Sequence, residues 1–169
     1  MKKIICFTDG ACSNNPGPGG YGIVFLKNIN DEKPVCMYFG GSDYTTNNRM
    51  ELTGVIESIK LAIKNNYDEI EIYSDSAYVV NAFIKGWIEK WEKNNWTTSQ
   101  NLQVKNKDLW LKFIECSRGK IKINFNKVSG HSNVKYNELA DKLAVEACNK
   151  ISNNEIQIGV VQVVGGKQN

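Results

Sequence analysis

The sequence contains one histidine, and none of its five cysteines form a C-x-x-C pair. A single histidine without paired cysteines cannot supply the usual ligands of a zinc site. The cysteines are odd in number, and free thiols in a reducing compartment explain them most simply. We therefore expect a cytoplasmic protein that holds neither structural zinc nor a disulfide framework.

Long apolar runs are also missing. No stretch approaches the roughly 18 apolar residues that cross a bilayer. The short apolar run at residues 4–7 meets Asp9 too early for a signal peptide, so we expect no membrane contact. With 169 residues, of which 41% are hydrophobic, the chain is long enough for one domain with a substantial core.

The net charge is only +3, but it is unevenly distributed. Residues 85–127 hold ten lysines or arginines and four acidic residues, a net charge of +6, and the remainder of the chain nets −3. An acidic part beside a basic part is typical of a metal site next to a groove for a polyanion. An ordinary solvated surface accounts for the same distribution equally well.

Hydrophobic periodicity predicts an α/β fold with a five-stranded mixed sheet flanked by helices. The expected strands lie at residues 4–9, 21–26, 35–41, 69–75 and 120–128. The expected helices lie between residues 45 and 65, at 76–84, around Trp87 and Trp91, at 106–117 and at 134–149. The strand–helix–strand order predicts that the strand at 69–75 runs parallel to the first strand.

We expect residues 1–150 to form the single domain and residues 151–169 to form a tail. Residues 156–164 of this tail have the composition of a strand, but the alternation slips at Val160 and Val161. The predicted sheet therefore ends at five strands.

Three acidic residues stand out by their positions. Asp9 and Asp75 each end a predicted strand, and Glu51 lies near the start of a predicted helix. Because residues beyond the carboxyl ends of parallel strands share one edge of a sheet, Asp9 and Asp75 can meet there. Asp141 on the last helix can join them, although spacing alone does not establish it. An uncompensated buried charge is unfavourable, so we expect a metal ion at Asp9.

The glycines at 17, 19 and 22 match the G-x-G-x-x-G spacing of a dinucleotide site. That fingerprint must open a helix, whereas residues 21–26 are typical of a strand. We interpret residues 10–20 as a turn that connects two neighbouring strands.

Six stretches of the chain resemble, in the same order, the motifs of type 1 ribonuclease H. They are FTDG at 7–10, NPGPGGYG at 15–22, TTNNRMEL at 45–52, SDSAYV at 74–79, VKNKDLW at 104–110, and GH at 130–131 followed by NELAD at 137–141. The match spans about residues 3–149. It implies a ribonuclease H-like fold and an endonuclease that hydrolyses the RNA strand of RNA–DNA hybrids, leaving 5′-phosphate and 3′-hydroxyl ends.

The resemblance assigns Asp9, Glu51, Asp75 and Asp141 to a site for two Mg²⁺ ions, with Mn²⁺ as a substitute. Two like charges about 4 Å apart repel by about 4 kcal/mol at an effective dielectric near 20, so clustered carboxylates need cations. Two divalent ions can activate water and stabilise the leaving oxygen, and oxygen ligands suit magnesium. By analogy with the family, Asp9 bridges both ions.

A lone histidine is more often a surface or core residue than a catalytic one. His131 nevertheless follows a glycine and precedes Asp141 by ten residues, as in the family. The resemblance therefore implies a catalytic role in proton transfer or product release, because histidine titrates near neutral pH.

The implied partner is an RNA–DNA hybrid duplex, and we expect a monomer. The resemblance implies that Asn15, Asn47 and Asn48 contact the grooves of the hybrid, where the 2′-hydroxyl distinguishes RNA from DNA. Ala77 stands where many relatives carry a glutamine, so one groove contact is expected to be missing.

The stretch 86–105 resembles the basic protrusion that holds the DNA strand in this family. It contains Trp87, Lys90 and Trp91, which the resemblance makes substrate-binding residues. The alternative interpretation is a cluster of tryptophans that belongs to the core.

Three other functions fit parts of the sequence. A transposase or integrase core shares the fold but lacks the Asn-Asn-Arg-Met-Glu and Gly-His signatures. A non-catalytic nucleic-acid-binding module would be indicated by loss of a carboxylate, and all four are present. The third is an interaction domain whose tail, residues 156–164, adds a strand to the sheet of a partner.

Overall fold

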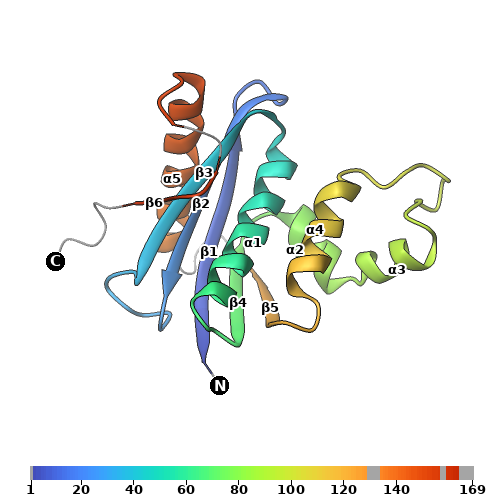
Figure 1. The fold of residues 1–169 in the computed structure, drawn as a ribbon, viewed down its shortest axis with the longest axis horizontal. Coiled ribbons are helices and arrows are strands. Elements are labelled where there is room, and N and C mark those ends of the chain that lie inside the picture. Colours follow the sequence, from blue (N-terminus) through green and yellow to red (C-terminus); the bar gives the residue numbers. More distant parts are fainter. Residues whose placement is uncertain (1, 129–133, 157–158, 164–169) are drawn as a thin grey trace.

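The computed structural model describes residues 2–128, 134–156 and 159–163, and a mixed sheet lies at its centre (Figure 1). Within these residues six strands follow the order β5-β4-β1-β2-β3-β6. The strands are β1 (Lys3–Cys12), β2 (Gly17–Leu26), β3 (Cys36–Thr45), β4 (Glu69–Ser74), β5 (Lys122–Lys127) and β6 (Val161–Gln162). The helices are α1 (Asn47–Lys64), α2 (Ala77–Ile84), α3 (Trp87–Lys93), α4 (Lys107–Ser117) and α5 (Val134–Ser152).

The central strand β1 has one neighbour of each kind. It runs antiparallel to β2 and parallel to β4, which confirms the predicted parallel pairing of these two strands. β5 extends the sheet parallel to β4, and β3 extends it antiparallel to β2. The carboxyl ends of β1 and β4 therefore lie at the same edge of the sheet.

The prediction of a five-stranded sheet is wrong by one strand. β6 pairs antiparallel with β3, and the backbone N–H of Val163 donates to the carbonyl oxygen of Met37 at 2.9 Å. A strand of two residues is too short to produce an alternating pattern, and its bonds to the free edge of β3 come from backbone groups that any sequence supplies.

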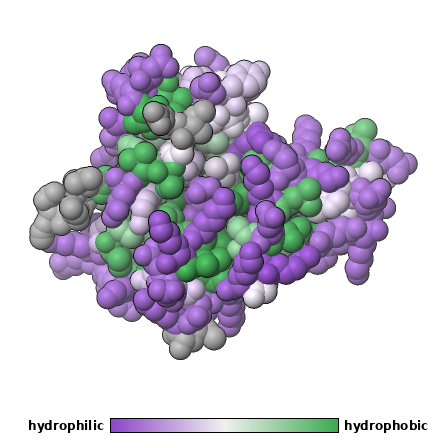
Figure 2. Space-filling model, in the orientation of Figure 1, coloured by the Kyte–Doolittle hydropathy of each residue, from purple (hydrophilic) through white to green (hydrophobic). Residues whose placement is uncertain are grey.

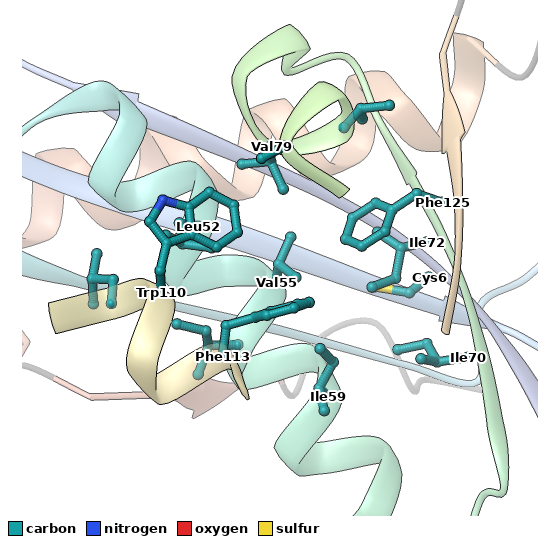
Figure 3. Packing of buried hydrophobic residues seen from close by; sticks show 14 of the residues in the cluster. Cys6, Leu52, Val55, Ile59, Ile70, Ile72, Val79, Trp110, Phe113 and Phe125 are labelled. Atoms are coloured by element: carbon teal, nitrogen blue, oxygen red, sulfur yellow. The ribbon is translucent and has the colours of Figure 1, made fainter. Parts of the chain in front are cut away.

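The two faces of β1 pack against different helices because successive side chains of a strand point in opposite directions. Ile4 and Cys6 belong to the hydrophobic cluster that includes α1 and α4, part of which is seen in Figure 3. Ile5 and Phe7 belong to the second cluster, which includes the inner face of α5. The strand is thus covered on both faces, which explains its nearly continuous apolar sequence.

Local sequence sets the start of α1. The hydroxyl of Thr46 accepts a hydrogen bond from the backbone N–H of Arg49 at 3.2 Å and so caps the helix. The helix ends at Lys64, and Asn66 then adopts a left-handed conformation with φ of 67°. Asparagine tolerates this conformation better than most residues, so the Asn-Asn pair suits the end of the helix.

α3 and the chain that follows it form a protrusion at one end of the molecule (Figure 1). On the face drawn in Figure 2, hydrophilic side chains predominate over this protrusion. None of the helices in the described part of the chain has the length and apolar character needed to cross a membrane.

Candidate active site

Asp9 lies on the last part of β1 and points toward the face covered by α5, because Phe7, two residues earlier, packs there. Its Cα partner across the sheet is Gly22 of β2. The side chain is buried, and its Oδ1 atom accepts a hydrogen bond from the backbone N–H of Gly10 at 2.9 Å.

Glu51 reaches the same place from α1. The helix approaches β1 closely because Gly10 has no side chain: a Cβ atom there would lie 2.6 Å from the backbone nitrogen of Glu51. Glu51 is itself buried, and its Oε1 atom has no hydrogen-bond partner among the described residues. A buried polar atom without a partner costs about 1–3 kcal/mol, so this oxygen is available for a ligand.

Asp75 directly follows β4 and lies between two serines. The hydroxyl of Ser74 accepts a hydrogen bond from the backbone N–H of Ser76 at 3.0 Å. The hydroxyl of Ser76 in turn caps α2 by accepting from the N–H of Val79 at 3.3 Å. These bonds hold the turn in which the exposed Asp75 carboxylate sits.

The structure brings three of the predicted carboxylates together. One oxygen from each of Asp9, Glu51 and Asp75 lies within 4.8 Å of the others. Sequence reasoning joined Asp9 and Asp75 through the parallel strands, and the contact of Glu51 depends on the close approach at Gly10.

Asp141 reaches the edge of this cluster from α5. This helix rests directly on β2, because a Cβ atom at Gly22 would lie 2.3 Å from the carbonyl oxygen of Ala140. Since Gly22 pairs with Asp9, the next residue of the helix, Asp141, lies near enough to Asp9 to raise the pKa of its carboxyl group, although it is not one of the three clustered carboxylates. The side chain of Asp141 is exposed.

The electrostatics of the cluster favour a bound cation. Burial raises the pKa of Asp9 above its usual value, and the Asp75 charge raises it further. Burial likewise raises the pKa of Glu51, and the charges of Asp9 and Asp75 add to that effect. Both carboxyl groups are therefore costly to ionise without a positive partner. All the nearby ligand atoms are carboxylate oxygens, which suit a hard divalent cation, so these residues fit such an ion.

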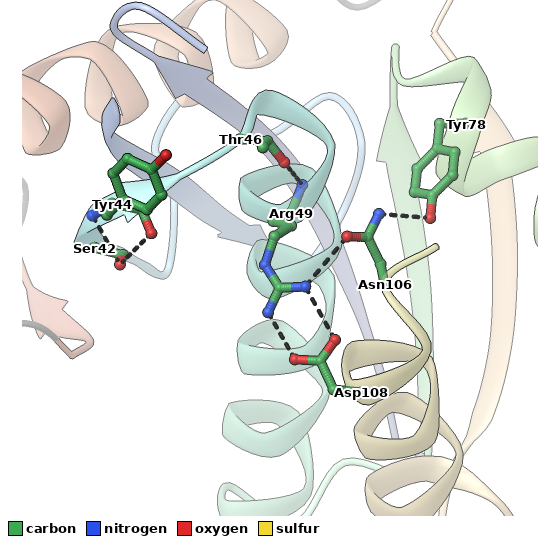
Figure 4. Close-up of polar contacts among 7 residues, drawn as sticks. All are labelled: Ser42, Tyr44, Thr46, Arg49, Tyr78, Asn106 and Asp108. Carbon is green, nitrogen blue, oxygen red and sulfur yellow. Dashed lines mark hydrogen bonds and ion pairs between the residues drawn. The ribbon is translucent and has the colours of Figure 1, made fainter. Parts of the chain in front are cut away.

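A polar network ties α1 to the helices beside it (Figure 4). The guanidinium of Arg49 donates to both carboxylate oxygens of Asp108, at 2.7 and 3.0 Å, and to Oδ1 of Asn106 at 3.2 Å. The Nδ2 atom of Asn106 donates to the hydroxyl of Tyr78 on α2 at 3.0 Å. The network therefore links the start of α1, which precedes Glu51, to α2 and α4.

The predicted groove contacts form a second exposed group. The Oδ1 atom of Asn15 accepts a hydrogen bond from the backbone N–H of Asn47 at 2.8 Å, which joins the turn after β1 to the start of α1. Asn48 is the next residue of α1, and all three side chains are exposed. Their predicted contact with substrate stays a prediction.

Trp87, Lys90 and Trp91 lie on α3. The rings of the two tryptophans are 6.2 Å apart, and that of Trp91 is 5.6 Å from Trp110 of α4. Both α3 tryptophans are half-buried against the first core cluster, whereas Lys90 is exposed. The tryptophans thus help attach the protrusion, and a role of these residues in substrate binding stays a prediction.

His131 lies outside the described residues.

Sequence reasoning missed the glycines that let the helices approach. Gly10 admits α1 and Gly22 admits α5, and both lie inside strands. A glycine within a strand can mark the close approach of another backbone, so the signal was present in the sequence.

A sheet with carboxylates gathered at the carboxyl ends of its parallel strands defines an α/β protein suited to bind divalent cations. The RNase H family model matches residues 1–149. The chain therefore belongs to the RNase H family, which confirms the resemblance seen in its motifs.

Individual relatives agree with this assignment. A ribonuclease H of Caldanaerobacter subterraneus subsp. tengcongensis is 49% identical over 145 residues, which are 85% of this chain and 90% of that protein. The structure of LC9-RNase H1, a type 1 RNase H with the type 2 active-site motif, has a TM-score of 0.77 at 25% identity and covers 97% of this chain and 79% of its own. LC11-RNase H1, solved in complex with an RNA/DNA hybrid, shares the fold with a TM-score of 0.66 at 22% identity, over 87% of this chain and 97% of its own.

Proposed function

We propose that this chain is an endonuclease that hydrolyses the RNA strand of RNA–DNA hybrids and leaves 5′-phosphate and 3′-hydroxyl ends. The observation that carries this proposal is the cluster of carboxylate oxygens from Asp9, Glu51 and Asp75, within 4.8 Å of one another, in a chain of the RNase H family. Relatives named ribonuclease H and a neighbour solved with an RNA/DNA hybrid support the substrate class.

The proposed cofactor is a pair of Mg²⁺ ions, for which Mn²⁺ can substitute, held by Asp9, Glu51, Asp75 and Asp141. Bound ions of this kind supply an activated water and stabilise the leaving oxygen of the phosphodiester. The buried Asp9 and Glu51 supply the fixed part of the ligand set. Asp75 and Asp141 are exposed, so they supply the part of the ligand set that solvent and a phosphate can reach.

Substrate binding is proposed for the exposed asparagines beside this cluster. Asn15, Asn47 and Asn48 carry amide groups that can donate to and accept from base edges and 2′-hydroxyls. The bond between Asn15 and the backbone of Asn47 holds two of these groups in a fixed relation. The basic part of the chain, residues 85–127, supplies the salt-dependent attraction to the phosphates, with Trp87, Lys90 and Trp91 on the protrusion.

The remaining proposals rest on sequence. We propose that His131 assists proton transfer or product release, on the strength of its motif.

Residues 1–150 form the proposed catalytic domain, although α5 continues to Ser152. The five free cysteines support a reducing, cytoplasmic location. A monomer is proposed because the predicted site draws all its ligands from one chain.

The proposed activity is tested with an RNA–DNA hybrid labelled on the RNA strand, with Mg²⁺ and with chelator. We expect cleavage of the RNA strand only with the metal ion. Asp9→Asn should reduce turnover at least about 10³-fold, equivalent to about 4 kcal/mol of transition-state stabilisation. Asp68→Asn is the matched control, because Asp68 is exposed and precedes β4, at the opposite end of that strand from Asp75. Cleavage by Asp9→Asn at the rate of this control would refute the proposal.

A further inference from the structure

The first turn of α5 is held by two contacts to the connection between β2 and β3, residues 27–35. The hydroxyl of Tyr136 donates to the backbone carbonyl oxygen of Asp31 at 2.5 Å. The Nζ atom of Lys135 donates to the carbonyl oxygen of Glu32 at 3.2 Å. The same ammonium group lies 5.1 Å from the centre of the Tyr136 ring. Both acceptors are backbone atoms, so α5 binds the main chain of the β2–β3 connection and not its side chains.

Tyr136 also contacts the strand that carries the first carboxylate. Its ring is buried and lies 6.0 Å from that of Phe7, which stacks on Tyr73 of β4 at 4.8 Å. Phe7 precedes Asp9 by two residues, so both side chains project from the same face of β1. One side chain of α5 therefore packs against β1 through its ring and binds the β2–β3 connection through its hydroxyl.

Asp141 follows Tyr136 by five residues, about 7.5 Å along the helix axis. Unlike Asp9 and Glu51, its side chain is exposed, so burial of its own carboxylate does not fix its place. The position of its carboxylate is therefore set by the position of α5, and the helix is rigid over this distance. A rotation or a slide of the first turns is carried directly to Asp141.

Several contacts limit such movement, among them the packing of Leu143 and Ala147 in the second core cluster and the bond from the Cys148 thiol to the carbonyl oxygen of Pro18. The close approach of Ala140 to Gly22 sets how near α5 lies to the sheet. That contact and the apolar packing of α5 are non-directional, so they fix the distance of the helix from the sheet more closely than its rotation. The hydrogen bond of Tyr136 is directional and lies off the axis, so it opposes rotation and sliding together.

We infer that Tyr136 is a positioning residue of the active site, whose hydroxyl holds α5 at the angle that brings Asp141 to Asp9. This inference rests on the proposed metal-dependent activity. Misplacement of a catalytic group by about 1 Å can cost up to about 10²-fold in rate, and one lost tie among several should cost less. The bond acts before substrate arrives, so it affects metal binding and turnover rather than affinity for the hybrid.

The variant Tyr136→Phe removes the hydroxyl and keeps the ring on Phe7. We expect kcat to fall about threefold to tenfold with KM for the hybrid unchanged, and Mn²⁺ affinity, measured calorimetrically on the metal-free protein, to fall by a similar factor. Tyr67→Phe is the matched control, since Tyr67 is partly buried at the far end of α1. Equal kcat and equal Mn²⁺ affinity in the two variants would overturn the role of Tyr136.

A double-mutant cycle separates positioning from general packing. Deletion of residues 30–33 removes both backbone acceptors and leaves Tyr136 and the carboxylates in place. If the hydroxyl acts through Asp31, adding Tyr136→Phe to this deletion should cause no further loss of Mn²⁺ affinity. A full, additive loss would overturn the inference. Failure of the wild-type protein to bind Mn²⁺, or undiminished binding by Asp9→Asn, would instead refute the proposed metal site itself.

Discussion

α1 and α5 bring acidic residues to the end of β1 from opposite faces of the sheet, and they do so in different ways. α1 places Glu51 in the interior, where the carboxylate is buried beside Asp9. α5 places Asp141 at an exposed position, near enough to Asp9 to raise its pKa. The proposed site therefore has a buried half, fixed by the core, and an exposed half, fixed by how a helix docks.

The difference shows which physical effect controls each half. In the buried half the dominant cost is desolvation, since burial is the largest cause of the raised pKa values of Asp9 and Glu51. In the exposed half the controlling factor is geometry, since the place of Asp141 depends on Gly22 and Tyr136. Changes on the α1 side should thus alter charge energetics, and changes on the α5 side should alter position.

The largest effect on stability is expected where α5 meets the sheet. Gly22→Ala would place a Cβ atom 2.3 Å from the carbonyl oxygen of Ala140, and a backbone atom of a docked helix cannot give way cheaply. Overpacking of this kind costs about 1–3 kcal/mol. We expect a loss near the upper end, measured by denaturant unfolding, together with at least a tenfold loss of turnover as Asp141 moves away.

Gly54→Ala tests the same contrast on the α1 side. Its Cβ atom would meet the side-chain oxygen of Thr8 at 2.6 Å, and the alanine is favoured over glycine within a helix by up to about 1 kcal/mol. The buried Thr8 side chain can shift more readily than the backbone of a docked helix, so we expect a smaller net loss than from Gly22→Ala, about 1–2 kcal/mol. A larger loss from Gly54→Ala than from Gly22→Ala would contradict the contrast between the two docking surfaces.

A smaller effect is expected from the segment after α5. β6 adds only two paired residues to β3, although Ile156 and Val163 pack on the second core cluster. Truncation after Ser152 should lower stability by about 1 kcal/mol, since it exposes part of that cluster and the β3 edge. Turnover should stay unchanged, because the proposed ligands precede the truncation.

Thermal melting and a hybrid-cleavage assay on the truncated chain check this expectation, and light scattering shows whether the freed β3 edge leads to association. Unchanged melting would leave the tail without a structural role. A large loss of turnover would connect the tail to the active site.

The sequence predicted most of the fold because its signals were local. The strand at the start of the chain and the helices at 76–84 and 106–117 follow from residue type and spacing, and α2 and α4 lie within those ranges. The parallel pairing of β1 and β4 followed from the order of elements. The strand composition of residues 156–164 was visible, but the pairing of β6 was not predicted, since it depends on the free edge of β3.

The clustering of the predicted carboxylates followed only in part from the sequence. Asp9 in the last part of β1 and Asp75 just after β4 could be placed together by topology. The approach of Glu51 depends on Gly10, and that of Asp141 depends on Gly22, and such contacts require the three-dimensional packing of helix on sheet. The hydrogen bond of Tyr136 joins residues more than a hundred positions apart, so no local sequence pattern indicates it.

The central claim is that the buried carboxylates at the end of β1 need divalent cations. Asp9 and Glu51 have higher pKa values when folded than a carboxyl group has in the unfolded chain, so the folded state binds their protons more tightly. In metal-free protein this stabilisation is fully present below the unfolded carboxyl pKa of about 4, and it is lost as the pH rises from there through the folded pKa, which is about 7 for Asp9.

Thermal melting at pH 5 and pH 8, with chelator and with Mg²⁺, tests the claim most directly. We predict that the metal-free wild-type protein is less stable at pH 8 than at pH 5, and that Mg²⁺ restores stability at pH 8. Asp9→Asn should be more stable than the wild type in chelator at pH 8, by about 1–2 kcal/mol, and should gain less from Mg²⁺. Equal stability in chelator and an equal gain from Mg²⁺ in the two proteins would contradict the account.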